Sequence, residues 1–237
     1  MNIFGVHLDR RATLPQVEEV KSAIQQQGRE AVFFNANAAD QEKRQELVAA
    51  MRNRCSDQGA PGTVRVLLHS IAFGSLLPYV SGNQDKVASK AQLEMTCDTM
   101  AHTLIYWVQD LLSSGLMLRG GRVFAMTSAG GSRAIAQYGP VSGAKALLES
   151  HIRQLALELA PFGITANAIR AGVTNTPSSR KIPGSEKLFE FAALRNPYGR
   201  LTTPQDVARC IAVLSQEGTY WMTGNTIGVD GGEDIVA

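Results

Sequence analysis

Two residues at the start of a predicted helix have side chains suited to proton transfer. Tyr138 and Lys145 are seven positions apart in the segment YGPVSGAK. Seven residues make about two helical turns, so both side chains project from nearly the same face. Lys145 leans back toward Tyr138, because helical side chains point N-terminally, and an ammonium beside a phenol lowers the pKa of that phenol. The spacing therefore predicts an acid–base pair; the alternative is a half-buried aromatic residue and a solvated lysine.

Hydroxyl groups precede this pair in the chain. Thr127 and Ser128 end the predicted strand GRVFAMTS and are either catalytic residues or ordinary strand-end hydroxyls in a turn. Asp98 lies on a long predicted helix, where it either faces the same site or is solvated. His69 and His102 are expected to be structural, because a single histidine at a strand end or on a helix face usually is.

Strand-like and helix-like segments alternate along the chain, and this alternation must position those residues. Short β-branched or aromatic runs are separated by longer amphipathic segments. The predicted strands cover residues 2–8, 31–37, 64–72, 121–128, 164–172 and 226–232, and the predicted helices cover about 14–27, 41–55, 90–116 and 139–159. Such alternation predicts an α/β fold, with a doubly wound parallel sheet covered by helices on both faces, in a single domain over residues 1–237.

The composition argues against several classes of partner and of structural site. The chain is 44% hydrophobic and 19% charged, with a formal net charge of +2. Its basic residues are scattered, so neither nucleic acid nor a membrane is an expected partner. Three widely spaced cysteines form neither a disulfide framework nor a metal-ligand pattern. Without a signal peptide or a long apolar segment, a cytoplasmic protein is expected.

Four motifs together resemble the short-chain dehydrogenase/reductase superfamily, whose fold is Rossmann-type. They are the Tyr–Lys pair on one helix, the strand TANAIRAG, the closing VDGG, and HSIAFG at residues 69–74. Most members space the pair as YxxxK, whereas Tyr138-x6-Lys145 and HSIAFG resemble the bacterial enoyl-[acyl-carrier-protein] reductases. The resemblance implies reduction of the 2,3 double bond of an enoyl thioester, carried by acyl carrier protein or CoA, in fatty-acid biosynthesis. A 3-oxoacyl or general ketoreductase is the alternative enzyme.

In this resemblance, the acid lies away from the carbon that receives hydride. Hydride adds to the β-carbon while negative charge develops on the thioester oxygen, so Tyr138 is expected to donate a hydrogen bond to that oxygen. Lys145 is expected to hold the nicotinamide ribose. Thr127 and Ser128 occupy positions near the substrate, and the sequence has no second tyrosine there.

The resemblance also implies a dinucleotide cofactor. Asp9, Arg10 and Arg11 follow the first predicted strand, where the fold meets the adenine ribose; two arginines beside one aspartate favour NADPH, although NADH is possible. The alternative is a solvated charged turn. The other expected cofactor contacts are Asn37 and Ala38 at the adenine, Ser70, Ile71 and Ala72 in the central cleft, Lys145 at the ribose, and Val173, Thr174 and Thr176 at the nicotinamide amide and the phosphates.

One family feature is missing from the sequence. Relatives begin with a strand and TGxxxGIG, whose glycines let the backbone approach the pyrophosphate. This chain contains no such motif, and its first predicted strand corresponds to the second strand of the family. We expect a truncated reading frame or cloned fragment with a rearranged sheet and weak or no dinucleotide binding. A catalytically silent, oligomer-forming module is therefore a further alternative.

Two expectations concern parts of the chain outside the catalytic segment. Residues 174–184 are irregular and rich in Ser, Pro and Lys, so we expect a mobile substrate lid over about residues 174–195. Relatives assemble through the helix that carries Lys145 and through the last strand, which implies a tetramer or dimer. The segment LLESHIRQLALELA has apolar residues on more than one face, which is compatible with a buried interface; the alternative is a monomer in which this helix is packed internally.

Overall fold

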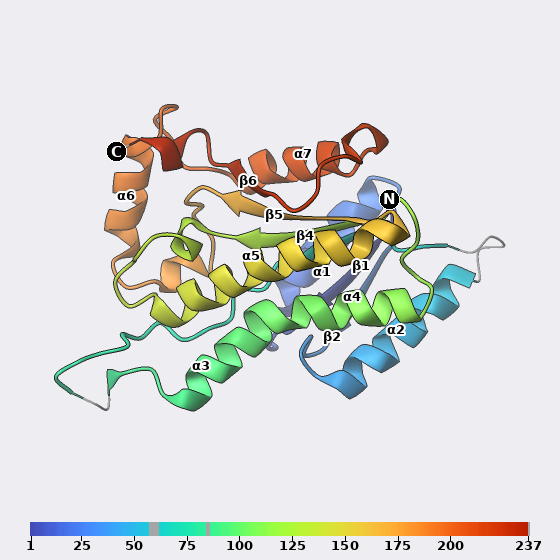
Figure 1. The fold of residues 1–237 in the computed structure, drawn as a ribbon, viewed down its shortest axis with the longest axis horizontal. Helices are drawn as coiled ribbons and strands as arrows, with labels where there is room; N and C mark the ends of the chain where they lie inside the picture. Colours follow the sequence, from blue (N-terminus) through green and yellow to red (C-terminus); the bar gives the residue numbers. More distant parts are fainter. Residues whose placement is uncertain (57–61, 84–85, 237) are drawn as a thin grey trace. The chain divides into compact units, whose positions relative to one another are not determined.

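The structure is a computed structural model of the chain that describes residues 1–56, 62–83 and 86–236. These residues form two compact units. One contains residues 1–63 and 109–116, and the other contains residues 64–108 and 117–237. Each unit is described by itself (Figure 1).

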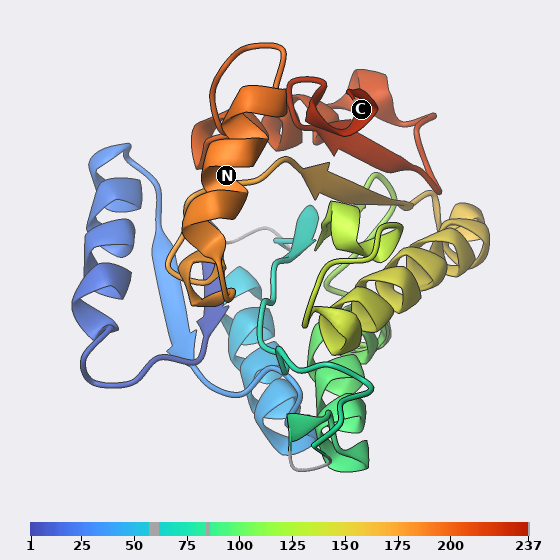
Figure 2. The same ribbon diagram turned by 90° about the vertical axis from the view of Figure 1, so that its left-hand side faces the viewer.

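The N-terminal unit is built on two parallel strands. Strand β1 (Ile3–His7) pairs with β2 (Ala31–Asn35) in a register that runs from Ile3 opposite Ala31 to His7 opposite Asn35. Helix α1 (Leu14–Gln26) joins the two strands, and α2 (Gln41–Ser56) follows β2. Figure 2 shows α1 beside β2, and the two elements are in contact.

The larger unit contains a four-stranded sheet. Its order is β3 (Val66–His69), β4 (Arg122–Thr127), β5 (Thr165–Ala171) and β6 (Thr226–Val229), and every pair is parallel. Parallel strands require crossover segments, and helices supply them here. All carboxyl ends of the strands therefore meet at one edge of the sheet, where the candidate catalytic residues follow β4 and β5.

The helices of this unit lie between and after those strands. They are α3 (Lys90–Cys97), the π-helix η2 (Asp98–His102), α4 (Thr103–Ser113), α5 (Gly139–Leu159), α6 (Ser185–Arg195) and α7 (Pro204–Leu214); the last residues of α4 belong to the N-terminal unit. Short 3-10 turns are η3 (Ala129–Gly131), η4 (Ala160–Phe162), η5 (Ser179–Lys181), η6 (Glu217–Thr219) and η7 (Glu233–Ile235).

The core lies on both faces of this sheet. Helix α5 contacts β4 and β5, and its residues Leu148 and Ile152 are fully buried (Figure 1). Val207 and Leu214 of α7 pack with Phe124 and Ile169, which the alternation of side chains places on the opposite face. Burial on both faces explains why these strands read as continuous apolar runs.

The α/β class and the parallel sheets predicted from the sequence are confirmed, with strand and helix bounds close to those expected. The expected rearrangement takes one form: among the described residues, the strands form two sheets, one with the order β1-β2 and one with the order β3-β4-β5-β6. The helix expected over residues 90–116 is observed as one continuous helical segment from Lys90 to Ser113, formed by α3, a π-helical turn at Asp98–His102, and α4. Helices α6 and α7 were not predicted.

Candidate active site

Lys145 is a deeply buried charged group of the candidate site. Its side chain leaves the inner face of α5, and the residue is 5% exposed. The ammonium donates hydrogen bonds to the carbonyl oxygens of Met126, at 2.6 Å, and Ile71, at 3.5 Å. Burial lowers the pKa of Lys145 to about 8, and the negative charge of Glu149 partly opposes that shift. The ammonium is thus fixed between the ends of β3 and β4.

Tyr138 stands at the first position of the same segment, as the residue that caps α5 before Gly139. The preceding Gln137 has φ of 59°, a left-handed conformation that residues with a side chain rarely adopt. Burial raises the pKa of Tyr138, and the neighbouring Ser128 hydroxyl acts in the opposite direction. The expectation that Lys145 lowers the pKa of this phenol is therefore wrong, because removal of the phenolate from water has the larger effect.

The two predicted hydroxyl residues differ in their partners. Thr127 donates to the Glu149 carboxylate at 2.7 Å, so its hydroxyl connects the end of β4 to α5. Ser128 Oγ is buried and has no hydrogen-bond partner among the described atoms. It lies beside Tyr138, because a methyl group added at Gly130 would lie 2.6 Å from the Tyr138 ring and 3.3 Å from Ser128 Oγ. Ser128 therefore places its hydroxyl next to the phenol, where it acts on the pKa of Tyr138 against the effect of burial.

The ends of β3 and β5 carry the other predicted residues of this unit. Ile71 contributes its carbonyl to Lys145, while Ser70 and Ala72 are exposed beside it. Thr174 donates to the Gly172 carbonyl at 2.9 Å, and Thr176 exchanges hydrogen bonds with Ser179.

Val173 has a different kind of partner. Its N–H, expected at the nicotinamide amide, donates to the Glu233 carboxylate at 2.9 Å. Within the described structure, this backbone donor is therefore already engaged.

The predicted adenosine contacts lie in the N-terminal unit. Asp9 follows β1, and its carboxylate lies 3.0 Å from His7 Nδ1. Hydrogen bonding from Thr13 is the main cause that lowers the pKa of Asp9. Its backbone exchanges two hydrogen bonds with the side chain of Asn35, which fixes this turn against β2.

The remaining predicted residues of that unit are less constrained. Arg10 and Arg11 are exposed, Ala38 is half-buried, and Asn37 accepts from the Ala39 N–H at 3.0 Å. These residues and the Tyr138 segment belong to different units.

Asp98, which the sequence left open, and the two histidines expected to be structural have partners within the fold. Asp98 accepts a hydrogen bond from the Tyr106 hydroxyl at 2.8 Å. His69 is buried and contacts Thr103 Oγ1 at 2.7 Å, while His102 pairs with His151 at 3.1 Å. Burial lowers the pKa of His69 to about 3, so this imidazole is neutral near pH 7.

Two carboxylates were missed from the sequence. Glu149 follows Lys145 by one helical turn, and this spacing could have identified it. Glu233 has no such signal, because its contacts are with residues distant in sequence. In the described part of the chain, no group of three or more His, Cys, Asp or Glu residues could hold a metal ion. No helix there is long and apolar enough to cross a bilayer.

A family model described as "Enoyl-(Acyl carrier protein) reductase" matches residues 3–233. The chain belongs to this family. A 1-cyclohexenylcarbonyl-CoA reductase of Streptomyces collinus is 39% identical over 124 residues, covering 52% of this chain. The NADH-type enoyl-[acyl-carrier-protein] reductase FabI of Aquifex aeolicus is 29% identical over 175 residues, covering 74%. The matched segments span 44% and 64% of these relatives' own lengths.

Solved structures of the same family share the fold. The enoyl-[acyl-carrier-protein] reductase (NADH) of Aquifex aeolicus superposes with a TM-score of 0.82 at 25% identity, over 100% of this chain and 87% of that chain. The Bacillus cereus enoyl-acyl carrier protein reductase, solved with NADP+, gives a TM-score of 0.86 at 23% identity with the same coverages. The names of these relatives include both NADH and NADP+, so the family does not fix the dinucleotide.

Proposed function

We propose that this chain reduces the 2,3 double bond of an enoyl thioester with NAD(P)H. The observation that carries the proposal is the placement of the Ser128 hydroxyl beside the Tyr138 phenol, with the buried Lys145 ammonium seven positions along the same segment. The family match and the CoA and acyl-carrier-protein reductases among the relatives support the reaction class. Fatty-acid biosynthesis is the proposed context.

The chemistry follows from where charge develops. A bound dinucleotide would supply the hydride that adds to the β-carbon, and a proton from solvent would complete the reduction at the α-carbon. The enolate oxygen of the thioester then needs hydrogen-bond donors, and Tyr138 and Ser128 provide two hydroxyls there. A phenol with a raised pKa stays protonated at neutral pH and keeps its donor role. Lys145 adds positive charge and a donor for a ribose hydroxyl.

The residues fit part of a dinucleotide. Lys145 suits the nicotinamide ribose, while Ser70, Ile71, Ala72, Val173, Thr174 and Thr176 remain the proposed contacts around it. Asp9 with Asn37 and Ala38 is proposed for the adenosine, and the exposed Arg10 and Arg11 favour the 2′-phosphate of NADPH over NADH. The sequence contains no TGxxxGIG turn for the pyrophosphate, which makes weak binding the expected result.

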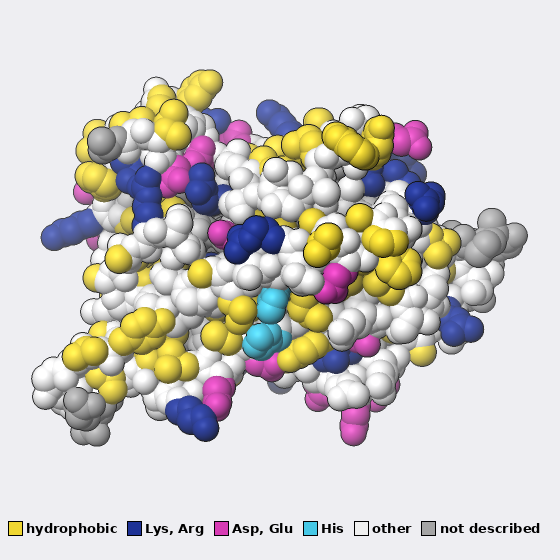
Figure 3. All heavy atoms as spheres, viewed as in Figure 1, with side chains coloured by type: hydrophobic (Ala, Val, Ile, Leu, Met, Phe, Trp, Pro, Cys, Tyr) yellow, Lys and Arg dark blue, Asp and Glu magenta, His cyan; other side chains and the backbone are white. Residues whose placement is uncertain are grey.

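Further parts of the proposal concern assembly and substrate entry. Figure 3 shows hydrophobic side chains gathered over the face that carries α5, and Leu157 and Phe162 near the end of this helix are 70% and 55% exposed. This surface suits a homodimer or tetramer.

Residues 174–195 are proposed as the substrate lid. A cytoplasmic location is a separate part of the proposal.

The deciding experiment compares crotonyl and acetoacetyl thioesters, each on CoA and on acyl carrier protein, by following oxidation of NADPH and NADH. The enoyl substrates should be turned over in preference to the ketones. Preference for the ketones would assign the chain to the ketoreductases. Absence of turnover together with absence of dinucleotide binding in titration calorimetry would favour the silent, oligomer-forming module.

A further inference from the structure

The last turn of the chain carries two carboxylates that are held by residues distant in sequence. Glu233 is 3% exposed, and Asp234 follows it. The turn is fixed by Asp230, whose carboxylate accepts from the N–H groups of Gly232 and Asp234 at 3.0 and 3.3 Å. Gly231 and Gly232 have φ of 63° and 85°, so glycine is needed here for the chain to fold back after β6.

Glu233 connects the end of β5 to helix α6. One carboxylate oxygen accepts from the Val173 N–H at 2.9 Å, and the other lies 3.4 Å from the Arg195 guanidinium at the end of α6. Gly172 makes room for this carboxylate, because a methyl group there would lie 2.9 Å from Glu233 Oε2. The Asn196 side chain adds a second contact between the end of α6 and this turn, because it donates a hydrogen bond to the Asp230 carbonyl oxygen at 2.8 Å.

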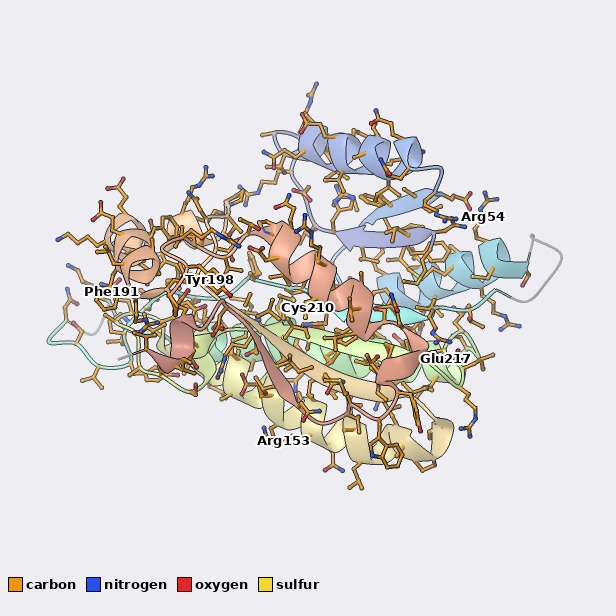
Figure 4. The ribbon with its side chains drawn as sticks, turned by 90° about the horizontal axis from the view of Figure 1, so that it is seen from above. Arg54, Arg153, Phe191, Tyr198, Cys210 and Glu217 are labelled. Atoms are coloured by element: carbon orange, nitrogen blue, oxygen red, sulfur yellow. The ribbon has the colours of Figure 1, made fainter. Side chains whose placement is uncertain are left out.

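The last residue of helix α6 lies beside this turn. Figures 1 and 2 both show the C-terminal turn beside α6. The Arg195 guanidinium also lies 5.7 Å from the centre of the Phe191 ring, one helical turn earlier; Figure 4 labels Phe191 on this helix. The ring helps to orient the guanidinium toward Glu233.

Asp234 connects two other segments. Its two carboxylate oxygens form ion pairs with Arg133 at 3.0 Å and Arg170 at 2.9 Å, and its main-chain carbonyl also accepts a hydrogen bond from Arg133. Arg133 lies between Ser128 and Tyr138 in the catalytic segment, and Arg170 is in β5. The Asp234 side chain is 14% exposed, and a carboxylate largely removed from water is costly unless it is paired, so these ion pairs favour one position of the turn over others.

We propose that Glu233 and Asp234 form a C-terminal clamp whose two halves position different parts of the active site: Glu233 positions the β5 end and α6, and Asp234 positions the loop that carries Tyr138. This inference rests on the proposed function for its kinetic consequence alone. Both are positioning residues, because they act through Val173, Arg195 and Arg133. Loss of Glu233 should weaken substrate retention, whereas loss of Asp234 should slow the chemical step.

Hydrogen–deuterium exchange of the full chain tests the clamp without any ligand. Glu233→Ala should speed exchange in residues 172–195 by about tenfold and leave residues 129–137 unchanged. Asp234→Ala should do the reverse. Glu233→Gln keeps an acceptor for the Val173 N–H and should release α6 more than residue 173. Glu94→Gln, which alters an exposed carboxylate paired with Lys90 on α3, is the matched control.

Kinetics adds a second readout. Glu233→Ala should raise KM for the thioester with kcat nearly kept, and Asp234→Asn should lower kcat with KM nearly kept. Equal exchange in wild type and both variants, or faster exchange that spreads to residues 148–159 of α5, would overturn the clamp. If the wild-type chain reduces no thioester, the proposed function fails, while the exchange pattern still decides whether the clamp exists.

Discussion

The Lys145 ammonium is hydrogen-bonded to the Met126 carbonyl oxygen, 2.6 Å away at the end of β4. The lysine is thus anchored to the backbone of the sheet, and its charged ammonium group is buried. Burial of the ammonium, and not this hydrogen bond, lowers its pKa to about 8. A cation that is desolvated in the free protein is prepared to interact strongly with a ligand that enters beside it.

Substitutions that remove the neighbouring hydroxyls of Tyr138 and Ser128 should lower the rate of catalysis more than the stability of the fold. Tyr138→Phe removes the proposed donor to the enolate oxygen and should lower kcat by about 100-fold or more. Ser128→Ala should lower kcat by roughly tenfold while the free energy of unfolding changes by only about 1 kcal/mol, because a single hydroxyl beside the phenol is lost. Thioester reduction and urea denaturation measure both. Unchanged kcat in both variants would remove these hydroxyls from the mechanism.

The pH dependence of stability should report the buried lysine. The pKa of Lys145 is lowered from 10.5 to about 8, so between these values the unfolded chain holds the proton more tightly than the folded chain. The free energy of unfolding should therefore rise through this window, by at most roughly 3 kcal/mol. Lys145→Met should lack this rise. Urea denaturation of both proteins across the window measures it, and parallel curves would contradict the assigned burial.

His69 should lower stability on the acid side. The Thr103 hydroxyl donates to the Thr99 carbonyl, so it accepts from His69 Nε2–H, and the buried Nδ1 has no partner in the described structure. The pKa of His69 is lowered to about 3, so stability is complete above its unfolded value of 6.5 and is lost as pH falls. Between about pH 7.5 and about pH 5 the loss should be about 2 kcal/mol.

The variant His69→Gln serves as the comparison for that loss, because glutamine does not titrate. Its free energy of unfolding should fall less over the same interval. In nuclear magnetic resonance spectra, the His69 ring should keep its neutral chemical shifts throughout. A ring that titrates near its ordinary pKa would show that the site is hydrated.

Gly130→Ala should disturb the site through the Tyr138 ring. The added methyl group would lie 2.6 Å from a ring carbon, and the ring can move only by shifting the phenol. We expect kcat to fall by roughly tenfold, because catalytic groups tolerate little displacement. Gly143→Ala is the control: on α5, its methyl group meets only Tyr79 Oη at 3.3 Å, and alanine favours a helix by about 0.5–1 kcal/mol. Equal activity of the two variants would contradict the prediction.

Local pattern was sufficient for much of the fold. Alternating apolar runs predicted β1 to β6, and the periodicity after Tyr138 predicted α5 with its observed bounds. Helix α7 carried a readable signal that was overlooked, because Thr203 and Asp206 form a capping box and Pro204 begins the helix. The sequence was sufficient to predict the Tyr138-x6-Lys145 spacing, the hydroxyls before it and the family, because each depends on residues close together in sequence.

The tertiary structure determined the burial, the pKa values and the hydrogen-bond partners of those residues. Burial and not the neighbouring lysine sets the direction of the Tyr138 pKa, and burial is a property of the packed molecule. The engagement of the Val173 N–H by Glu233 joins residues 60 positions apart, which no local pattern encodes. The sequence by itself determined which elements and chemical groups are present; only the packing of distant segments determined their protonation and their partners, because desolvation and long-range hydrogen bonds depend on the whole fold.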